Sequence, residues 1–271
     1  MTTTLSTLLA APPSGRDKAA FFDCHDYAES VILQGRQVPW QEPMAYSNFF
    51  GQAQGLLKPD AALLSLDRFY AQHLASNARL QTAMSAKSRT GYAVRTLLGD
   101  PETTEHAIEF ATTFVKTQRE PIILNIPSPR QWLSRTHHFS GSTDISRLGA
   151  DDAENASMYV ADWLRGFASL PLTAVMLDDR NLDAISPVPV DLATYSPVAN
   201  VTDHYRWALG LRGEDSVELR DNPLVGGVIT NGFWFEDNHQ LPAGDFFLSE
   251  IPPTAIPENV LTRISSLARP K

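Results

Sequence analysis

Helical patterns and short buried-strand patterns alternate along the chain from about residue 88, and this alternation limits the possible folds more than any other feature. Residues 100–118 and 151–168 carry apolar side chains at helical spacing, with acidic residues at their starts. Each is followed by a short apolar run typical of a buried strand, PIILNI (121–126) and LTAVML (172–177). Strands that alternate with helices imply parallel βαβ units, so the sequence predicts the α/β class.

The remainder of the chain follows this pattern less regularly. Ser196–Pro197 opens a helix toward His204, and residues 257–267 form the last helix. We expect further strands over residues 207–211, 225–235 and 246–251, of which the first two are weakened by glycines. The first 80 residues show helical spacing only, over residues 16–34, 43–57 and 59–80.

The length of the chain supports one large domain. A (β/α)₈ barrel typically needs about 250 residues, and the chain has 271, with no Gly-, Ser- or charge-rich boundary inside it. We therefore expect a single α/β domain, a TIM-like barrel in which residues 1–80 are mainly helical additions and residues 85–268 form βα units. An open doubly wound sheet is the alternative.

Several classes of protein are disfavoured by what the sequence lacks. The phosphate-binding, nucleophile-elbow and zinc-protease motifs G-x-G-x-x-G, G-x-x-x-x-G-K-S/T, G-x-S-x-G and H-E-x-x-H do not occur. The only cysteine, Cys24, rules out a disulfide framework or a thiolate-rich metal site, and we interpret it as a packed thiol. The 22 basic residues are scattered and the net charge is −9, which argues against a nucleic-acid partner.

No apolar run reaches the roughly 20 residues that a bilayer-spanning helix needs. The N-terminal apolar patch is not preceded by a basic region, so a cleaved signal peptide is not expected and the predicted compartment is the cytoplasm. The expected partner is a small molecule, neither a membrane nor a nucleic acid.

The most informative candidate site is the acidic pair that ends the LTAVML strand. Asp178 and Asp179 point to opposite faces because side chains alternate along a strand. Asp178 shares a face with Met176, so we expect it to face the mouth of the barrel, and Asp179 to lie outside it beside Arg180. A helix cap with a surface ion pair is the alternative interpretation.

Other candidates provide acid–base and anion-binding groups. Ser128, in the rigid turn IPSPR after PIILNI, either caps the next helix or binds an anion. Near the predicted strand 207–211, DHYRW contains an imidazole, a phenol and a guanidinium, and near the last strand lies Glu250. The residues of interest in DHYRW are His204, Tyr205 and Arg206. The segment SRTGYAVR contains two arginines, Arg89 and Arg95, that suit a carboxylate clamp, with Tyr92 between them.

These segments together resemble, distantly, the superfamily of cobalamin-independent methionine synthase and uroporphyrinogen decarboxylase. The likeness lies in PIILNIPSPRQWL, DDAENASMYVADWLRGFA and LTAVMLDD, and it covers about residues 85–268. It implies a (β/α)₈ barrel with a substrate-binding acid at Asp178 or Asp179, a polar contact at Ser128 and, more loosely, a role for His204. The methyltransferase branch binds zinc through His, two Cys and Glu, whereas this chain has Cys24 alone. The decarboxylase branch needs neither metal nor cofactor.

The resulting functional hypothesis is a small-molecule enzyme, either a lyase or decarboxylase or a diverged methyltransferase, that acts on a polar carboxylated metabolite. Its catalytic residues would be Asp178, Asp179 and His204. Its substrate-binding residues would be Ser128, Arg89, Tyr92, Tyr205, Arg206 and Glu250. No metal or cofactor is assigned. The alternative is a non-catalytic binding or accessory subunit, with the Phe-rich N-terminal helices as a surface for a homodimer or another partner.

Overall fold

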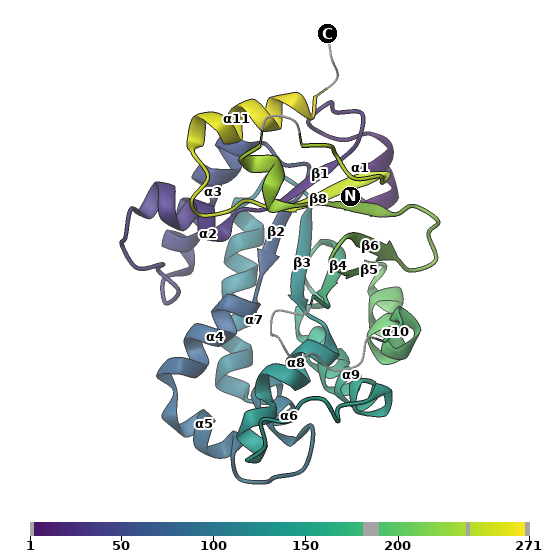
Figure 1. The fold of residues 1–271 in the computed structure, drawn as a ribbon. Helices are drawn as coiled ribbons and strands as arrows, with labels where there is room; N and C mark the ends of the chain where they lie inside the picture. Colours follow the sequence, from purple (N-terminus) through teal and green to yellow (C-terminus); the bar gives the residue numbers. More distant parts are fainter. Residues whose placement is uncertain (1–2, 181–189, 237–238, 269–271) are drawn as a thin grey trace.

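Eight strands form one barrel-shaped sheet in the order β1-β8-β7-β6-β5-β4-β3-β2 (Figure 1). The computed structural model describes residues 3–180, 190–236 and 239–268. The strands are β1 Ala20–Asp23, β2 Ala62–Ser65, β3 Ile122–Pro127, β4 Leu172–Asp178, β5 Ala208–Arg212, β6 Ser216–Leu219, β7 Gly226–Ile229 and β8 Phe246–Glu250. The expected α/β class and a barrel-like sheet are therefore observed.

The sheet differs from an all-parallel barrel at one strand. β6 runs antiparallel to both β5 and β7, and the other pairings between described strands are parallel. Short connections replace the crossover helices on either side of β6, because antiparallel neighbours can be joined directly. The sheet is mixed, and it is nearly closed where β1 meets β2.

Asp60 joins these two end strands. Its backbone N–H donates to Ala20 O at 3.0 Å, and its carboxylate accepts from Ala20 N at 2.9 Å. The same buried carboxylate accepts from Ser14 N at 2.8 Å and from Arg16 Nη1 at 3.2 Å. Asp60 thus pairs with both backbone groups of Ala20, in place of the strand-to-strand hydrogen bonds found elsewhere in the barrel.

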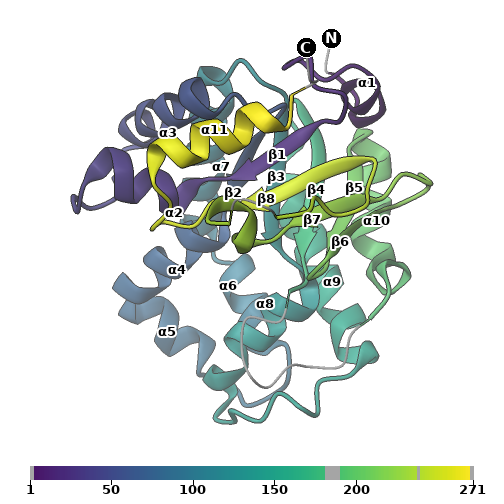
Figure 2. The same cartoon turned by 45° about the horizontal axis from the view of Figure 1, so that its top comes forward.

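The helices cover the outside of the sheet and extend beyond the carboxyl ends of β2 and β3 (Figure 1). Figure 2 shows α3 and α11 side by side next to β1. The helices are α1 Leu5–Ala10, α2 His25–Ala28, α3 Pro43–Leu57, α4 Asp67–Ser76, α5 Ala78–Met84, α6 Tyr92–Leu98, α7 Pro101–Thr117, α8 Pro129–Thr136, α9 Ala150–Leu164, α10 Ser196–Tyr205 and α11 Pro257–Ser266. A π-helix, Glu29–Leu33, continues α2. None of the described helices combines the length and apolar character needed to cross a bilayer.

Apolar side chains form two clusters, one inside the barrel and one between the sheet and its helices. The inner cluster contains Phe21, Leu63, Ile123, Met176 and Leu248, together with residues of α1. The outer cluster contains the aromatic residues of the N-terminal part. The five phenylalanines proposed as a partner surface are all buried there or in the barrel: Phe21, Phe22, Phe49, Phe50 and Phe69. They stabilise the chain's own core and offer no surface for a dimer.

Local sequence rules explain the elements that were predicted correctly. Asp100 caps α7 by accepting from Thr103 N, and Pro101 occupies its first turn. Ser128 caps α8 by accepting from Gln131 N at 3.1 Å, as expected for one of its two interpretations. Helix α10 begins at Ser196, as Ser196–Pro197 predicts.

Two predicted helices are wrong over part of their length. Residues 16–34 contain strand β1, and residues 59–80 contain strand β2 before α4 begins. All four residues of each strand are buried, so neither run shows the alternation that identifies a half-exposed strand. A short apolar run without alternation cannot be told from a helical segment by periodicity. The sequence reading also missed β6, a short strand that follows β5 after a tight turn.

Candidate functional site

The inward face of the barrel changes from apolar to polar at the carboxyl ends of its parallel strands. Side chains two positions apart share a face, so the positions that follow the inner apolar cluster also point inward. These positions, which we call the mouth layer, are Asp23, Ser65, Asn125, Asp178, Arg212 and Glu250. The carboxyl ends of parallel strands meet at one opening, which is where barrel enzymes place their active sites.

Arg180 spans this opening. Its Nε and Nη2 donate to the two Asp178 carboxylate oxygens at 2.9 and 2.7 Å, and its Nη1 donates to Glu250 Oε2 at 2.8 Å. In the sheet order, three strands separate β4 from β8 in either direction, so Asp178 and Glu250 belong to opposite walls. The Arg180 guanidinium therefore crosses the mouth of the barrel and forms ion pairs with carboxylates on both walls.

The Arg212 side chain lies among the same carboxylates and makes no hydrogen bond with any described residue. Its side chain is 2 % exposed, and Nε has no partner among the described residues. Its Nη1 is 3.8 Å from Asp178 Oδ2 and its Nη2 is 3.7 Å from Glu250 Oε2, both beyond hydrogen-bond distance. Burial lowers the pKa of this guanidinium, although the charge of Asp178 opposes that effect. A buried cation with unused donors is costly unless something binds it.

Asp178 is held in its ionised form. Burial acts to raise the pKa of its carboxyl, but the hydrogen bond from Arg180 and the positive charges of Arg212 and Arg180 outweigh burial, so the pKa is lowered. Asp178 is therefore negatively charged near neutral pH and can stabilise positive charge, whereas its lowered pKa makes it a weak base.

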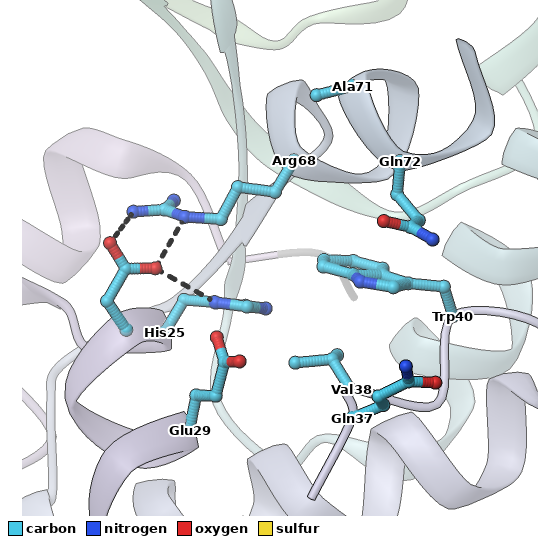
Figure 3. A pocket seen from close by; sticks show the side chains of 9 residues that line it. His25, Glu29, Gln37, Val38, Trp40, Arg68, Ala71 and Gln72 are labelled. Atoms are coloured by element: carbon cyan, nitrogen blue, oxygen red, sulfur yellow. Dashed lines mark hydrogen bonds and ion pairs between the residues drawn. The ribbon is translucent and has the colours of Figure 1, made fainter. Parts of the chain in front are cut away.

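A pocket of about 520 Å³ opens beside the mouth layer, over the ends of β1 and β2 (Figure 3). Arg68, which lines the pocket, also contacts the mouth layer, since its Nη1 is 3.4 Å from Asp23 Oδ2. The volume lies within the range of small-molecule sites. Its lining residues are His25, Asp26, Glu29, Gln37, Val38, Trp40, Arg68, Ala71 and Gln72.

Arg68 and Asp26 form a two-point ion pair at one end of the pocket. Arg68 Nε donates to Asp26 Oδ1 at 2.8 Å, and Arg68 Nη2 donates to Oδ2 at 3.0 Å. Hydrogen bonding with His25 and then with Arg68 holds the pKa of the Asp26 carboxyl well below its usual range. The carboxylate is therefore charged throughout the neutral pH range.

His25 is placed at this pocket by the turn that follows β1. Its ring stacks on Trp40, with ring centres 5.1 Å apart and planes 11° apart, and the residue is 2 % exposed. Nδ1 lies 3.3 Å from Asp26 Oδ1, whereas Nε2 has no partner among the described residues. Figure 3 shows the Nε2 edge of the ring turned toward the space between Glu29 and Trp40.

Asp179 lies on the outer face, where it joins Ser128 in a buried cluster. The Ser128 hydroxyl donates to Asp179 Oδ1, and Arg130 donates from Nη2 to Oδ2 at 2.8 Å. The Tyr195 hydroxyl donates to Oδ1 at 3.2 Å. As alternation predicts, Asp178 and Asp179 face opposite sides, but Arg180 pairs with Asp178 rather than with Asp179. Ser128 and Asp179 tie β4 to α8 and do not face the mouth.

The structure places His204, Tyr205 and Arg206 at the other end of the barrel. They end α10 directly before β5, and β5 runs parallel to β4 with Ala208 opposite Ala174 and Arg212 opposite Asp178. These three residues therefore lie at the amino end of β5. His204 is exposed and is not brought together with Asp178.

Arg89 and Tyr92 also lie outside the mouth layer. Arg89 is exposed before α6, and the Tyr92 ring carries Lys87 Nζ at 5.2 Å from its centre. Helix α6 packs against α8 and α9. Of the predicted substrate-binding residues, only Glu250 belongs to the mouth layer together with Asp178.

Cys24 is a buried thiol, as its interpretation predicted. It is 1 % exposed and belongs to the cluster outside the sheet. Burial, followed by the charge of Asp23, raises the pKa of the thiol strongly. The residues present therefore do not fit the zinc–thiolate site that the methyltransferase resemblance implies.

The sequence analysis did not identify three charged or titratable residues of this region, His25 and Arg68 at the pocket and Arg212 in the mouth layer. A common signal was available, since each follows an apolar run within a few residues: FFD before His25, LLSLD before Arg68 and ALGL before Arg212. In the segment DCHD, the polar groups at the pocket belong to His25 and Asp26, whereas Cys24 is the packed thiol that the sequence predicts. Comparison with family models, with curated proteins and with solved structures returned no match for this chain.

Proposed function

We propose that this protein is a small-molecule enzyme whose active site is the mouth layer, and that it acts on a polar carboxylated metabolite by lyase or decarboxylase chemistry. The observation that carries this proposal is Arg212, whose buried guanidinium makes no hydrogen bond with any of the described residues. A purely structural position of this kind is filled as well or better by an apolar residue. Unused donors in a polar layer are what an anionic ligand requires.

The neighbouring groups supply the remaining chemistry. In a decarboxylation the bond between carbon and the carboxylate breaks, carbon dioxide leaves, and the electron pair stays on the substrate carbon until that carbon takes up a proton. Arg212 would hold an anionic group of the substrate, and ionised Asp178 would stabilise a positively charged centre. The adjoining pocket gives room for the rest of the molecule.

The lyase branch of the resemblance is favoured over the methyltransferase branch. The only thiol of the chain is buried on the outer face of the sheet. The accessory-subunit alternative loses its candidate partner surface, because the phenylalanines of the N-terminal part are core residues.

Ligand binding by two arginine variants tests the proposal. We would screen mono-, di- and tricarboxylates by ligand-induced thermal shift and by saturation-transfer NMR. The variants are Arg212→Met and a matched control, Arg206→Met, at the opposite end of the barrel. We expect a carboxylate that stabilises the wild type and Arg206→Met but not Arg212→Met, with each protein compared with its own unliganded melting temperature. Binding that survives in Arg212→Met and is lost in Arg206→Met would place the anion site at the wrong end and refute the proposal.

A further inference from the structure

His25, Asp26 and Glu29 bring one nitrogen and two carboxylate oxygens together at the pocket. One ligand atom from each residue lies within 4.8 Å of the other two. The 3.3 Å between His25 Nδ1 and Asp26 Oδ1 is long for a hydrogen bond. It matches the separation of roughly 3.0–3.4 Å between two atoms that share a metal ion at about 2.1 Å.

The local backbone explains why these three residues converge. His25 and Asp26 open α2, and Glu29 follows four residues after His25, which places both on one helical face. Glu29 is also the first residue of the π-helix Glu29–Leu33. Single π-helical turns are uncommon and occur frequently at functional sites.

One nitrogen and one carboxylate of the cluster lack partners among the described residues. His25 is almost fully buried, and its Nε2 makes no hydrogen bond with any of them. The half-exposed Glu29 carboxylate makes no hydrogen bond or ion pair that the described part of the chain supplies, and it lies beside the His25 ring in Figure 3. Buried polar atoms in native proteins nearly always have a partner, so Nε2 indicates that a group binds in the pocket.

The charge around the pocket favours a cation as that partner. Among the described residues, the mouth layer, the pocket lining and the bridging Arg180 together contain five carboxylates and three guanidinium groups. The carboxylates belong to Asp23, Asp26, Glu29, Asp178 and Glu250, and the guanidinium groups to Arg68, Arg180 and Arg212. A divalent cation at the pocket would reduce this excess of negative charge.

Arg68 is compatible with a metal on Asp26. It occupies one lone pair on each Asp26 oxygen, and a carboxylate oxygen has two. Outer hydrogen bonds of this kind commonly orient a carboxylate ligand. With a metal on Nδ1, Nε2 carries the proton and presents it as a donor toward the pocket.

We propose that His25, Asp26 and Glu29 bind a divalent transition-metal ion, of the Mn²⁺, Fe²⁺ or Zn²⁺ class, with its remaining positions open to the pocket. One imidazole and two carboxylates suit these ions better than Ca²⁺, which takes six to eight oxygen ligands. The site is independent of Arg212. It rests on the proposed function only for its use in a reaction.

Direct metal binding tests the site without any substrate. The full chain is stripped with a chelator and titrated with Zn²⁺ by calorimetry and with Mn²⁺ by electron paramagnetic resonance. We expect one ion per chain in the wild type, and an affinity at least about tenfold weaker in Glu29→Gln and His25→Ala. Glu29→Gln keeps the size of a half-exposed side chain, so it reports on the site even where His25→Ala fails to fold.

The control is His106→Ala. His106 and His73 form a surface imidazole pair with ring centres 5.9 Å apart, where ions would bind adventitiously. Loss of binding in this variant, unchanged affinity in Glu29→Gln, or no stoichiometric binding in the wild type would each overturn the proposal. Metal binding together with no carboxylate binding would instead refute the proposed function and leave the metal site standing.

Discussion

Replacement of Asp179 by Ala should destabilise the fold strongly, although this residue lies outside the mouth. The side chains of Arg130 and Asp179 are 3 % and 9 % exposed, so their ion pair is shielded from water. The substitution removes the acceptor used by Arg130 and by the hydroxyls of Ser128 and Tyr195. Removal of one partner from a buried ion pair costs about 3–5 kcal/mol.

That cost has a measurable size. In a chain of this length, 1 kcal/mol corresponds to roughly 2–4 °C in melting temperature, so a decrease on the order of 10 °C is expected. Urea unfolding followed by tryptophan fluorescence measures the free energy, and calorimetry measures the melting temperature. Asp162→Ala is the control, because Asp162 is 72 % exposed and its pair with Arg165 lies at the surface. A loss below about 1 kcal/mol in Asp179→Ala would show that the cluster does not stabilise the fold and that the reasoning from burial is wrong.

Three further outcomes are expected. The pKa of Asp178 is lower in the folded chain than its unfolded value of about 3.9, so the ionised carboxylate stabilises the fold above pH 3.9, and this effect is lost as the pH falls through the folded pKa. Between pH 5 and pH 3, the free energy of unfolding in urea should therefore decrease less in Asp178→Asn than in the wild type. Equal decreases would contradict this. The Cys24 thiol should resist a thiol reagent in the native protein and react fully in denaturant, since it is 1 % exposed; rapid native labelling would contradict its burial. Asp60→Ala should cost at least about 3 kcal/mol in urea unfolding, because it leaves Arg16 buried and opens the seam at Ala20; a near-neutral effect would show that the seam does not depend on this carboxylate.

Helices and strands whose ends carry a recognisable sequence signal, such as a capping residue, were predictable from the sequence. Helix α7 has a capping Asp100 and a first-turn Pro101, and β4 ends where LTAVML meets its acidic pair. Strands β1 and β2 were not predictable in the same way, because they are only four residues long and buried on both faces. In such runs the tertiary environment decides between strand and helix.

The candidate site was predictable only at Asp178 and Glu250. Those residues end strands that the sequence marks clearly, so their place at the mouth follows from the parallel sheet. Arg212 required knowing that β5 ends there, and Arg68 required the unpredicted strand β2. His204 lies away from Asp178, because a residue that precedes a parallel strand lies at the opposite edge of the sheet from a residue that ends one.

The pairing of β1 with β8 has a consequence for the order in which the barrel can close. Ala20 lies opposite Phe247, so two strands that are far apart in the sequence must meet. Until β8 has formed, β1 presents an unpaired edge that carries two phenylalanines. Fragments of the chain that end before β8 are therefore expected to keep this edge open and to aggregate through it.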